Sequence, residues 1–160
     1  MTFNPMKHRI PILKRLVPSL RKRLSRATSH NGFALRASNV AVFLLNSENF
    51  VDRQIAFYAD FEREQTRSLF KQMKARGCDL FVDIGANIGL YAVQVALRGL
   101  SAEVLAFKPD ERNRLQLAAN ILINRVIGKI TVCDQAVSSS SGTVAFSPAS
   151  DTSTGQSARR

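Results

Sequence analysis

The 160-residue chain has only two cysteines and no apolar run long enough to cross a membrane. Cys78 and Cys133 lie far apart and beside predicted strands, so we expect buried thiols rather than metal ligands or catalytic groups. Without an apolar stretch of about 18 residues the sequence predicts no membrane span, and Lys and Arg interrupt Lys7–Leu24 too often for a secretory signal. Length and composition fit one globular domain, which we expect to be cytoplasmic.

Acidic residues are absent from positions 1–47, which contain nine Lys or Arg. The net charge of the chain is +11, so the remaining residues carry only +2. Apolar residues of this basic leader recur at helical spacing, with Pro18 as a break: Leu13, Leu16, Val17, Leu20 and Leu24. The leader is expected to be a solvated arm or, alternatively, a weak contact with an anionic membrane surface. Aromatic residues are sparse among its charges, which argues against nucleic-acid binding.

The central stretch Leu80–Asp110 reads as strand, turn, helix and strand. The apolar run from Leu80 predicts a strand that stops at Gly85, and helical spacing from Ile88 predicts a helix that ends near Arg98. A second strand, Val104–Phe107, closes at Pro109. Such a βαβ unit has parallel strands and a right-handed crossover, and open parallel sheets bind ligands beyond the carboxyl ends of their strands. The turn is therefore the predicted ligand site.

Asp83 is the most informative residue of this turn. A carboxylate that ends a buried strand is costly unless it accepts from the N–H groups of the turn or from a ligand ammonium. Asn87 either contacts a ligand or tolerates a strained turn. The glycines Gly85 and Gly89 do not have the GxGxxG spacing of nicotinamide enzymes.

The flanking segments supply the other predicted elements. Val40–Leu45 is a short strand or part of an N-terminal cap, and residues 60–76 form a helix that Gly77 ends. That helix has Phe61, Leu69, Phe70 and Met73 inside, with Glu62, Arg63, Glu64, Lys71 and Lys74 outside. Asp110 opens a further helix that ends at Gly128. Its predicted packing face is Leu115, Leu117, Ala118, Ile121 and Leu122.

Three features complete the predicted chain. Lys129–Cys133 alternates as a third strand, and Ser138–Gly142 reads as a turn between two short strands, the second being Thr143–Phe146. Residues 147–160 are rich in Ser, Thr, Ala and Gly, which predicts a disordered tail. The expected organisation is a leader over 1–47, an α/β domain over 48–146 and the tail over 147–160.

Three segments in order resemble the FkbM family of S-adenosylmethionine-dependent methyltransferases. They are Asp83–Gly89 (DIGANIG), Ala106–Asp110 (AFKPD) with Asn113, and Asn120 followed by Ala136–Ser138 and Ser141–Gly142. The resemblance covers roughly residues 57–146. It implies a doubly wound, Rossmann-like parallel sheet in which the GANxG turn holds the cofactor.

The resemblance also implies individual cofactor contacts. Asp83, Gly85, Ala86, Asn87 and Gly89 would cradle S-adenosylmethionine. Phe107, Lys108 and Pro109 would border its ribose, and Asp134, Gln135 and Ala136 would meet its adenine. The alternative for Asp134–Ala136 is an ordinary loop.

Lys108 departs from the family pattern, which usually has an acid at this position. A carboxylate accepts hydrogen bonds from both ribose hydroxyls, whereas a lysine ammonium only donates. Losing such a charged hydrogen bond costs on the order of 1.5–3 kcal/mol. We therefore expect weakened cofactor binding, or alternatively contact with a 2′-phosphate, although the turn lacks the glycine spacing of NADP readers.

The sequence accounts for fewer strands than the family's sheet, so an incomplete domain is expected. The edge beside Leu80–Ile84 would then be open to a second copy or another partner. His8 and His30 lie in the leader without triad partners, and no general base is nominated. Two functions remain open. One is methyl transfer to a hydroxyl of an unidentified small-molecule or glycan-like acceptor, and the other is a catalytically silent fragment or a nucleotide-binding or interaction module.

Overall fold

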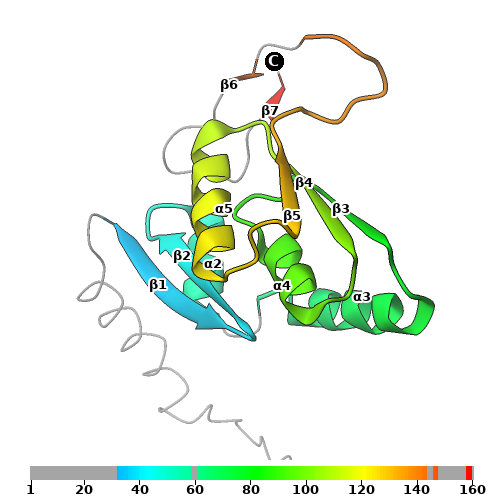
Figure 1. The fold of residues 1–160 in the computed structure, drawn as a ribbon. Coiled ribbons are helices and arrows are strands. Elements are labelled where there is room, and N and C mark those ends of the chain that lie inside the picture. Colours follow the sequence, from blue (N-terminus) through cyan, green and yellow to red (C-terminus); the bar gives the residue numbers. More distant parts are fainter. Residues whose placement is uncertain (1–31, 59–60, 144–145, 148–157, 160) are drawn as a thin grey trace, which may run out of the picture.

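The computed structural model describes residues 32–58, 61–143, 146–147 and 158–159, and Figure 1 shows their arrangement. The N-terminal elements are β1 (Phe33–Ser38), β2 (Ala41–Asn46), α2 (Phe50–Phe57) and α3 (Arg63–Arg76). They are followed by β3 (Leu80–Ile84), α4 (Leu90–Arg98), β4 (Glu103–Phe107), α5 (Glu111–Ile123) and β5 (Ile130–Cys133). The last are β6 (Phe146–Ser147) and β7 (Ala158–Arg159).

Strands β3, β4 and β5 form a parallel sheet in that order, with helices in the connections. In register, Val82 lies opposite Leu105 and Leu105 opposite Thr131. The predicted α/β class with a partial doubly wound, Rossmann-like sheet is confirmed. Side chains at the covered positions of this sheet are buried: Val104, Ala106 and Ile130.

Helices α4 and α5 lie between the β1–β2 hairpin and the parallel sheet (Figure 1), and both helices contact strands on each side. Six of the nine residues of α4, Leu90 and Ala92–Ala96, are buried. Such a helix is apolar nearly all round because other elements surround it. The core therefore sits at α4, beneath the turn that precedes it.

Side-chain amides of α5 complete the hydrogen bonding of the outer edge of β2. Asn124 accepts from Val42 N–H (2.9 Å) and donates to Val42 O (2.6 Å). Asn120 accepts from Leu44 N–H (2.7 Å), and Gln116 donates to Leu44 O (2.8 Å). Four helical residues rise about 6 Å and two strand residues about 6.8 Å, so amides four residues apart, such as Asn120 and Asn124, match alternate strand residues. We call Gln116, Asn120 and Asn124 the amide row.

A buried carboxylate joins the hairpin to α2 and α5. Asn49 caps α2 by accepting from the N–H groups of Val51 and Asp52. The Asp52 side chain is fully buried, and its Oδ2 accepts from Asn46 N–H (2.7 Å) and from Gln116 (2.5 Å). Burial raises the pKa of Asp52 to about 6, although both hydrogen bonds oppose the shift. Its Oδ1 has no hydrogen-bond partner.

Most predicted elements occur, with different boundaries. The predicted strand Val40–Leu45 corresponds to β2, whereas β1 and α2 were not predicted. Helix α4 begins two residues after Ile88 because Gly89 is in the left-handed region at its start. Helix α5 ends at Ile123 rather than at Gly128 because Arg125 already has a positive φ (56°).

The predicted packing face of α5 was partly wrong. Leu117 and Ile121 are buried, but Leu115, Ala118 and Leu122 are exposed. Their places toward the core are taken by Asn113 and Asn120, which are buried polar residues. A prediction from apolar periodicity places such amides on the solvent face, so it assigned part of the inner face of α5 to the wrong residues.

The predicted hairpin around Ser138–Gly142 was also wrong. Residues 134–138 form no strand, and Phe146–Ser147 instead pair antiparallel with Ala158–Arg159 of the predicted tail. The thiols of Cys78 and Cys133 are half-buried and unbonded to each other, rather than fully buried. The amphipathic segment Leu13–Leu24, both histidines and residues 148–157 lie outside the described residues.

Candidate ligand site at the carboxyl edge of the sheet

Backbone hydrogen bonds join the segments that follow β3, β4 and β5 into one edge. Phe107 O accepts from Gly85 N–H (2.9 Å) and from Ala86 N–H (3.0 Å). Cys133 O accepts from Lys108 N–H (2.9 Å). Adjacent strands lie about 4.8 Å apart, so the turn and the segment after β5 are separated by roughly 10 Å. The structure thus brings all the sequence-predicted site residues to this edge.

Asp83 fixes the start of α4. Its Oδ2 accepts from Ala92 N–H (3.2 Å), one of the amides that a helix start leaves without a backbone partner. Burial raises the pKa of Asp83 to about 6, the Ala92 hydrogen bond lowers it, and the charge of Glu62 raises it further. Asp83 is therefore about half ionised near pH 6 and becomes mostly anionic only at higher pH.

The turn between β3 and α4 has three left-handed residues, Gly85 (φ 78°), Asn87 (φ 49°) and Gly89 (φ 88°). The Asn87 side-chain oxygen is buried and has no hydrogen-bond partner. Among the described residues, nothing accepts from the N–H groups of Asn87 and Ile88. A buried, unpaired amide oxygen costs about 1–3 kcal/mol, so this turn has hydrogen-bonding capacity to offer a ligand.

Asn120 holds the same turn from the protein interior. Its amide nitrogen donates to Ile88 O (2.9 Å), while its oxygen accepts from β2. Asn120 is fully buried. The turn is therefore attached directly to the amide row and to the hairpin behind it.

Lys108 follows β4 directly, as the sequence predicts, and only 6% of the residue is exposed. Burial lowers the pKa of its ammonium, and the charge of Asp110 opposes that shift. Asp110 caps α5 by accepting from the N–H and the side-chain amide of Asn113 (3.0 and 3.1 Å). Arg114 also donates to the carbonyl oxygens of Lys108 and Pro109. The segment after β4 is thus tightly held.

Asp134, Gln135 and Ala136 follow β5 at the same edge, and all three are exposed. The polar side chains of Asp134 and Gln135 are accessible to a ligand that spans from the turn across the end of β4. Among the described residues, no group of three or more His, Cys, Asp or Glu side chains could hold a metal ion. No helix of the described part of the chain is long and apolar enough to cross a membrane.

Glu62 and Tyr91 belong to this site, but the sequence did not indicate either. Glu62 was expected on the outer face of a helix; instead it precedes α3 and is half-buried. The Tyr91 hydroxyl donates to Glu62, and burial together with the charges of Glu62 and Asp83 raises the pKa of Tyr91. Tyr91 lies on the first turn of α4, so Glu62 faces the same helix start as Asp83.

Comparisons with known proteins give distant matches among solved structures. No protein-family model matches the chain, and no curated protein matches its sequence. Among solved structures, it is similar to the M. jannaschii tRNA m1G37 methyltransferase with a TM-score of 0.49 and 14% identity, over 66% of this chain and 31% of that one.

Two further solved structures have comparable scores. A Pyrococcus horikoshii protein assigned as a transferase has a TM-score of 0.48 and 15% identity, over 79% of this chain and 50% of that one. The Methanocaldococcus jannaschii Trm5 structure with adenosine has a TM-score of 0.48 and 15% identity, over 66% and 31%. The chain is thus distantly similar in structure to methyltransferases, and it spans only a third to a half of the length of these proteins.

Proposed function

We propose that this edge binds S-adenosylmethionine and that the chain is a methyltransferase-type domain of the FkbM kind. One observation carries the proposal: Asp83 is anchored on the start of α4 while the neighbouring Asn87 keeps a buried amide oxygen without a partner. Both groups accept hydrogen bonds. S-adenosylmethionine offers an ammonium group, a positively charged sulfonium, ribose hydroxyls and an adenine amino group, all of which suit such acceptors.

The proposed contacts follow the order of the strands. Asp83 and Asn87 would meet the ammonium end or the ribose, with Gly85, Ala86 and Gly89 giving the backbone its close approach. Phe107 and Lys108 border the middle of the edge, and Asp134, Gln135 and Ala136 would meet the adenine. Two turn amides, those of Gly85 and Ala86, are engaged by Phe107 O and serve the fold rather than the ligand.

Bound S-adenosylmethionine would supply an activated methyl group for transfer to a nucleophile such as a hydroxyl oxygen. The part of the protein in that chemistry is to bind and orient, because alignment of donor and acceptor supplies most of the rate acceleration in such a displacement. Asp83 and the turn would fix the cofactor through its polar groups. We propose an unidentified small-molecule or glycan-like acceptor, met beyond this edge.

A second candidate function is ligand binding without turnover, and Lys108 favours it. A buried ammonium beside the position proposed for the ribose donates hydrogen bonds and accepts none. It also repels the positive charge of S-adenosylmethionine. The two candidates differ in whether methyl transfer follows binding.

Calorimetric titration with S-adenosylmethionine tests the proposal. We expect Asp83→Asn, which keeps a hydrogen-bond acceptor but loses the charge, to bind at least about tenfold more weakly than wild type, and Lys108→Gln to bind more tightly. Asp79→Asn is the matched control, because Asp79 is exposed at the opposite end of β3. If folded wild type and Lys108→Gln both fail to bind, the proposed cofactor is wrong.

A further inference from the structure

We propose that Glu62 is a positioning residue of this site: through the Tyr91 hydroxyl and its own charge beside Asp83, it controls the pH range in which the turn accepts a cationic ligand. The proposal rests on the S-adenosylmethionine site described above and adds a regulatory residue to it. Glu62 precedes α3, 21 positions before Asp83 in the chain, and lies outside the three motif segments on which the resemblance rests.

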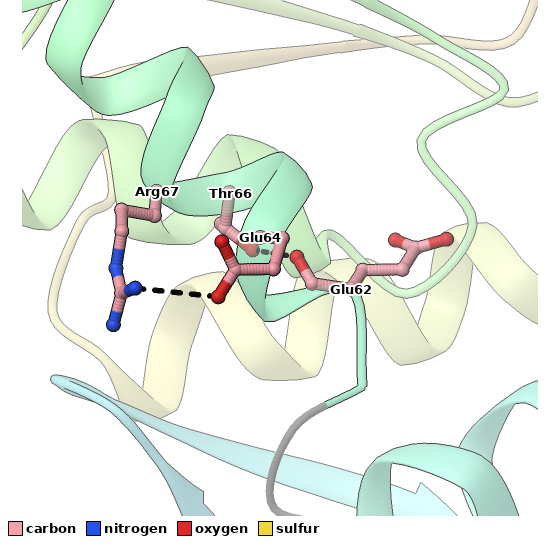
Figure 2. Close-up of polar contacts among 4 residues, drawn as sticks. All are labelled: Glu62, Glu64, Thr66 and Arg67. Carbon is pink, nitrogen blue, oxygen red and sulfur yellow. Dashed lines mark hydrogen bonds and ion pairs between the residues drawn. The ribbon is translucent and has the colours of Figure 1, made fainter.

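The backbone holds Glu62 in one unusual conformation. Its φ of 50° and ψ of 24° are left-handed, which costs a non-glycine residue about 1–2 kcal/mol. Thr66 secures this conformation, because both its N–H (2.9 Å) and its hydroxyl donate to Glu62 O. Figure 2 shows the consequence: the Glu62 carboxylate extends away from the first turn of α3, while Glu64 pairs with Arg67 (3.2 Å) on the other side.

This backbone turn directs Glu62 toward the start of α4. There its carboxylate accepts from the Tyr91 hydroxyl, so this hydrogen bond joins the segment before α3 to α4. Among the described residues, Asp83 accepts from the Ala92 N–H of α4 and meets the charge of Glu62 from the segment before α3, while Tyr91 of α4 meets the charges of both acids. Two acids thus face one helix start, and their mutual repulsion disfavours charge on Asp83.

A cation between these acids would reverse that balance. Below about pH 6, Asp83 holds a proton and presents a neutral carboxyl. Above that pH, Asp83 is mostly anionic, and a positively charged ligand relieves its repulsion by the charge of Glu62. Glu62 therefore has two separable effects. It strengthens cation binding at high pH, and it raises the pH below which cation binding is lost.

Glu62→Gln separates these effects from a structural role, because the amide oxygen can still accept from Tyr91. Glu64→Gln is the matched control: it removes the same charge two residues away, at a surface ion pair. The first readout is the carboxyl ¹³C shift of Asp83 against pH without ligand, assigned with Asp83→Asn. We expect the Asp83 midpoint to move to lower pH in Glu62→Gln and to stay in place in Glu64→Gln.

The second readout is the affinity for S-adenosylmethionine from pH 5 to 8. We expect Glu62→Gln to bind about three- to tenfold more weakly near pH 8, with its acid-side loss of binding shifted to lower pH. An unchanged Asp83 midpoint in Glu62→Gln, or an equal shift in Glu64→Gln, would overturn the proposal. A shifted midpoint without cofactor binding by wild type would instead uphold the coupling between the two acids and overturn the proposed cofactor.

Discussion

At the scale of single residues, the site depends on backbone conformations that only some residues adopt at low cost. Gly85 and Gly89 both have positive φ, but their surroundings differ. A Cβ on Gly85 would meet nothing within 4 Å. A Cβ on Gly89 would lie 2.5 Å from Leu117 Cδ1 and 3.2 Å from Val93 Cγ2. Gly89 therefore serves two purposes, a left-handed turn and the close packing of α4 against α5.

The two glycines give a matched pair of substitutions. Gly85→Ala should lower the free energy of unfolding by about 1–2 kcal/mol, the cost of a left-handed alanine. Gly89→Ala should cost about 1–3 kcal/mol more, because Leu117 and Val93 must move. Urea denaturation monitored by circular dichroism measures both differences. Equal losses in the free energy of unfolding would show that Leu117 moves aside without cost and that the packing of α4 against α5 does not require glycine at position 89.

Sequence reasoning located Asp83 correctly at the carboxyl end of a strand because an apolar run followed by glycines has few other structural outcomes. It could not locate Glu62. A helical pattern placed Glu62 on the outer face of α3. Because its φ is left-handed, Glu62 instead lies before the helix, which begins at Arg63. A left-handed backbone conformation at a single residue hardly changes the apolar periodicity of the sequence, so periodicity does not predict it.

At the scale of elements, a helix replaces a strand as the hydrogen-bonding neighbour of β2. The amide row supplies donors and acceptors to Val42 and Leu44, which would otherwise be unpaired on that side. Sequence patterns predicted α5 but assigned its inner face only in part, because the buried Asn113 and Asn120 are counted as polar. Strands β3 and β4 were predicted well because a short apolar run that Gly or Pro ends is seldom a helix, and β5 was predicted from the alternation of its residues.

Asn120 is the test of the amide row. Asn120→Leu would keep the volume but leave Leu44 N–H and Ile88 O without partners in a buried environment, so we expect a loss of about 2–5 kcal/mol in the free energy of unfolding. Asn124→Leu, at the exposed end of the row, should cost less than about 2 kcal/mol. Chemical denaturation of both variants measures the difference. A smaller effect for Asn120 than for Asn124 would contradict the idea that the row anchors the turn.

At the scale of the whole molecule, α4 and α5 cover one face of the parallel sheet, and the other face is largely open among the described residues. Leu80, Val82 and Ile84 of β3 are 47%, 43% and 64% exposed, whereas the covered Val104 is 1% exposed. Within the described residues, β3 has a single neighbouring strand, β4. The open edge expected from the sequence thus has a counterpart among the described residues, and its coverage by a second copy or another partner stays a prediction.

Paired valine truncations decide whether this face is covered in solution. Val104→Ala should lower the free energy of unfolding by about 2 kcal/mol, because buried methyl groups are removed from a packed core. Val82→Ala should cost under about 0.5 kcal/mol if the face stays open to water. A loss at Val82 as large as that at Val104 would mean that something packs on the face. Sedimentation velocity would then show what covers the face. If a second copy covers it, both the measured mass and the effect of Val82→Ala depend on protein concentration. If a segment of the same chain covers it, neither the mass nor the effect depends on concentration.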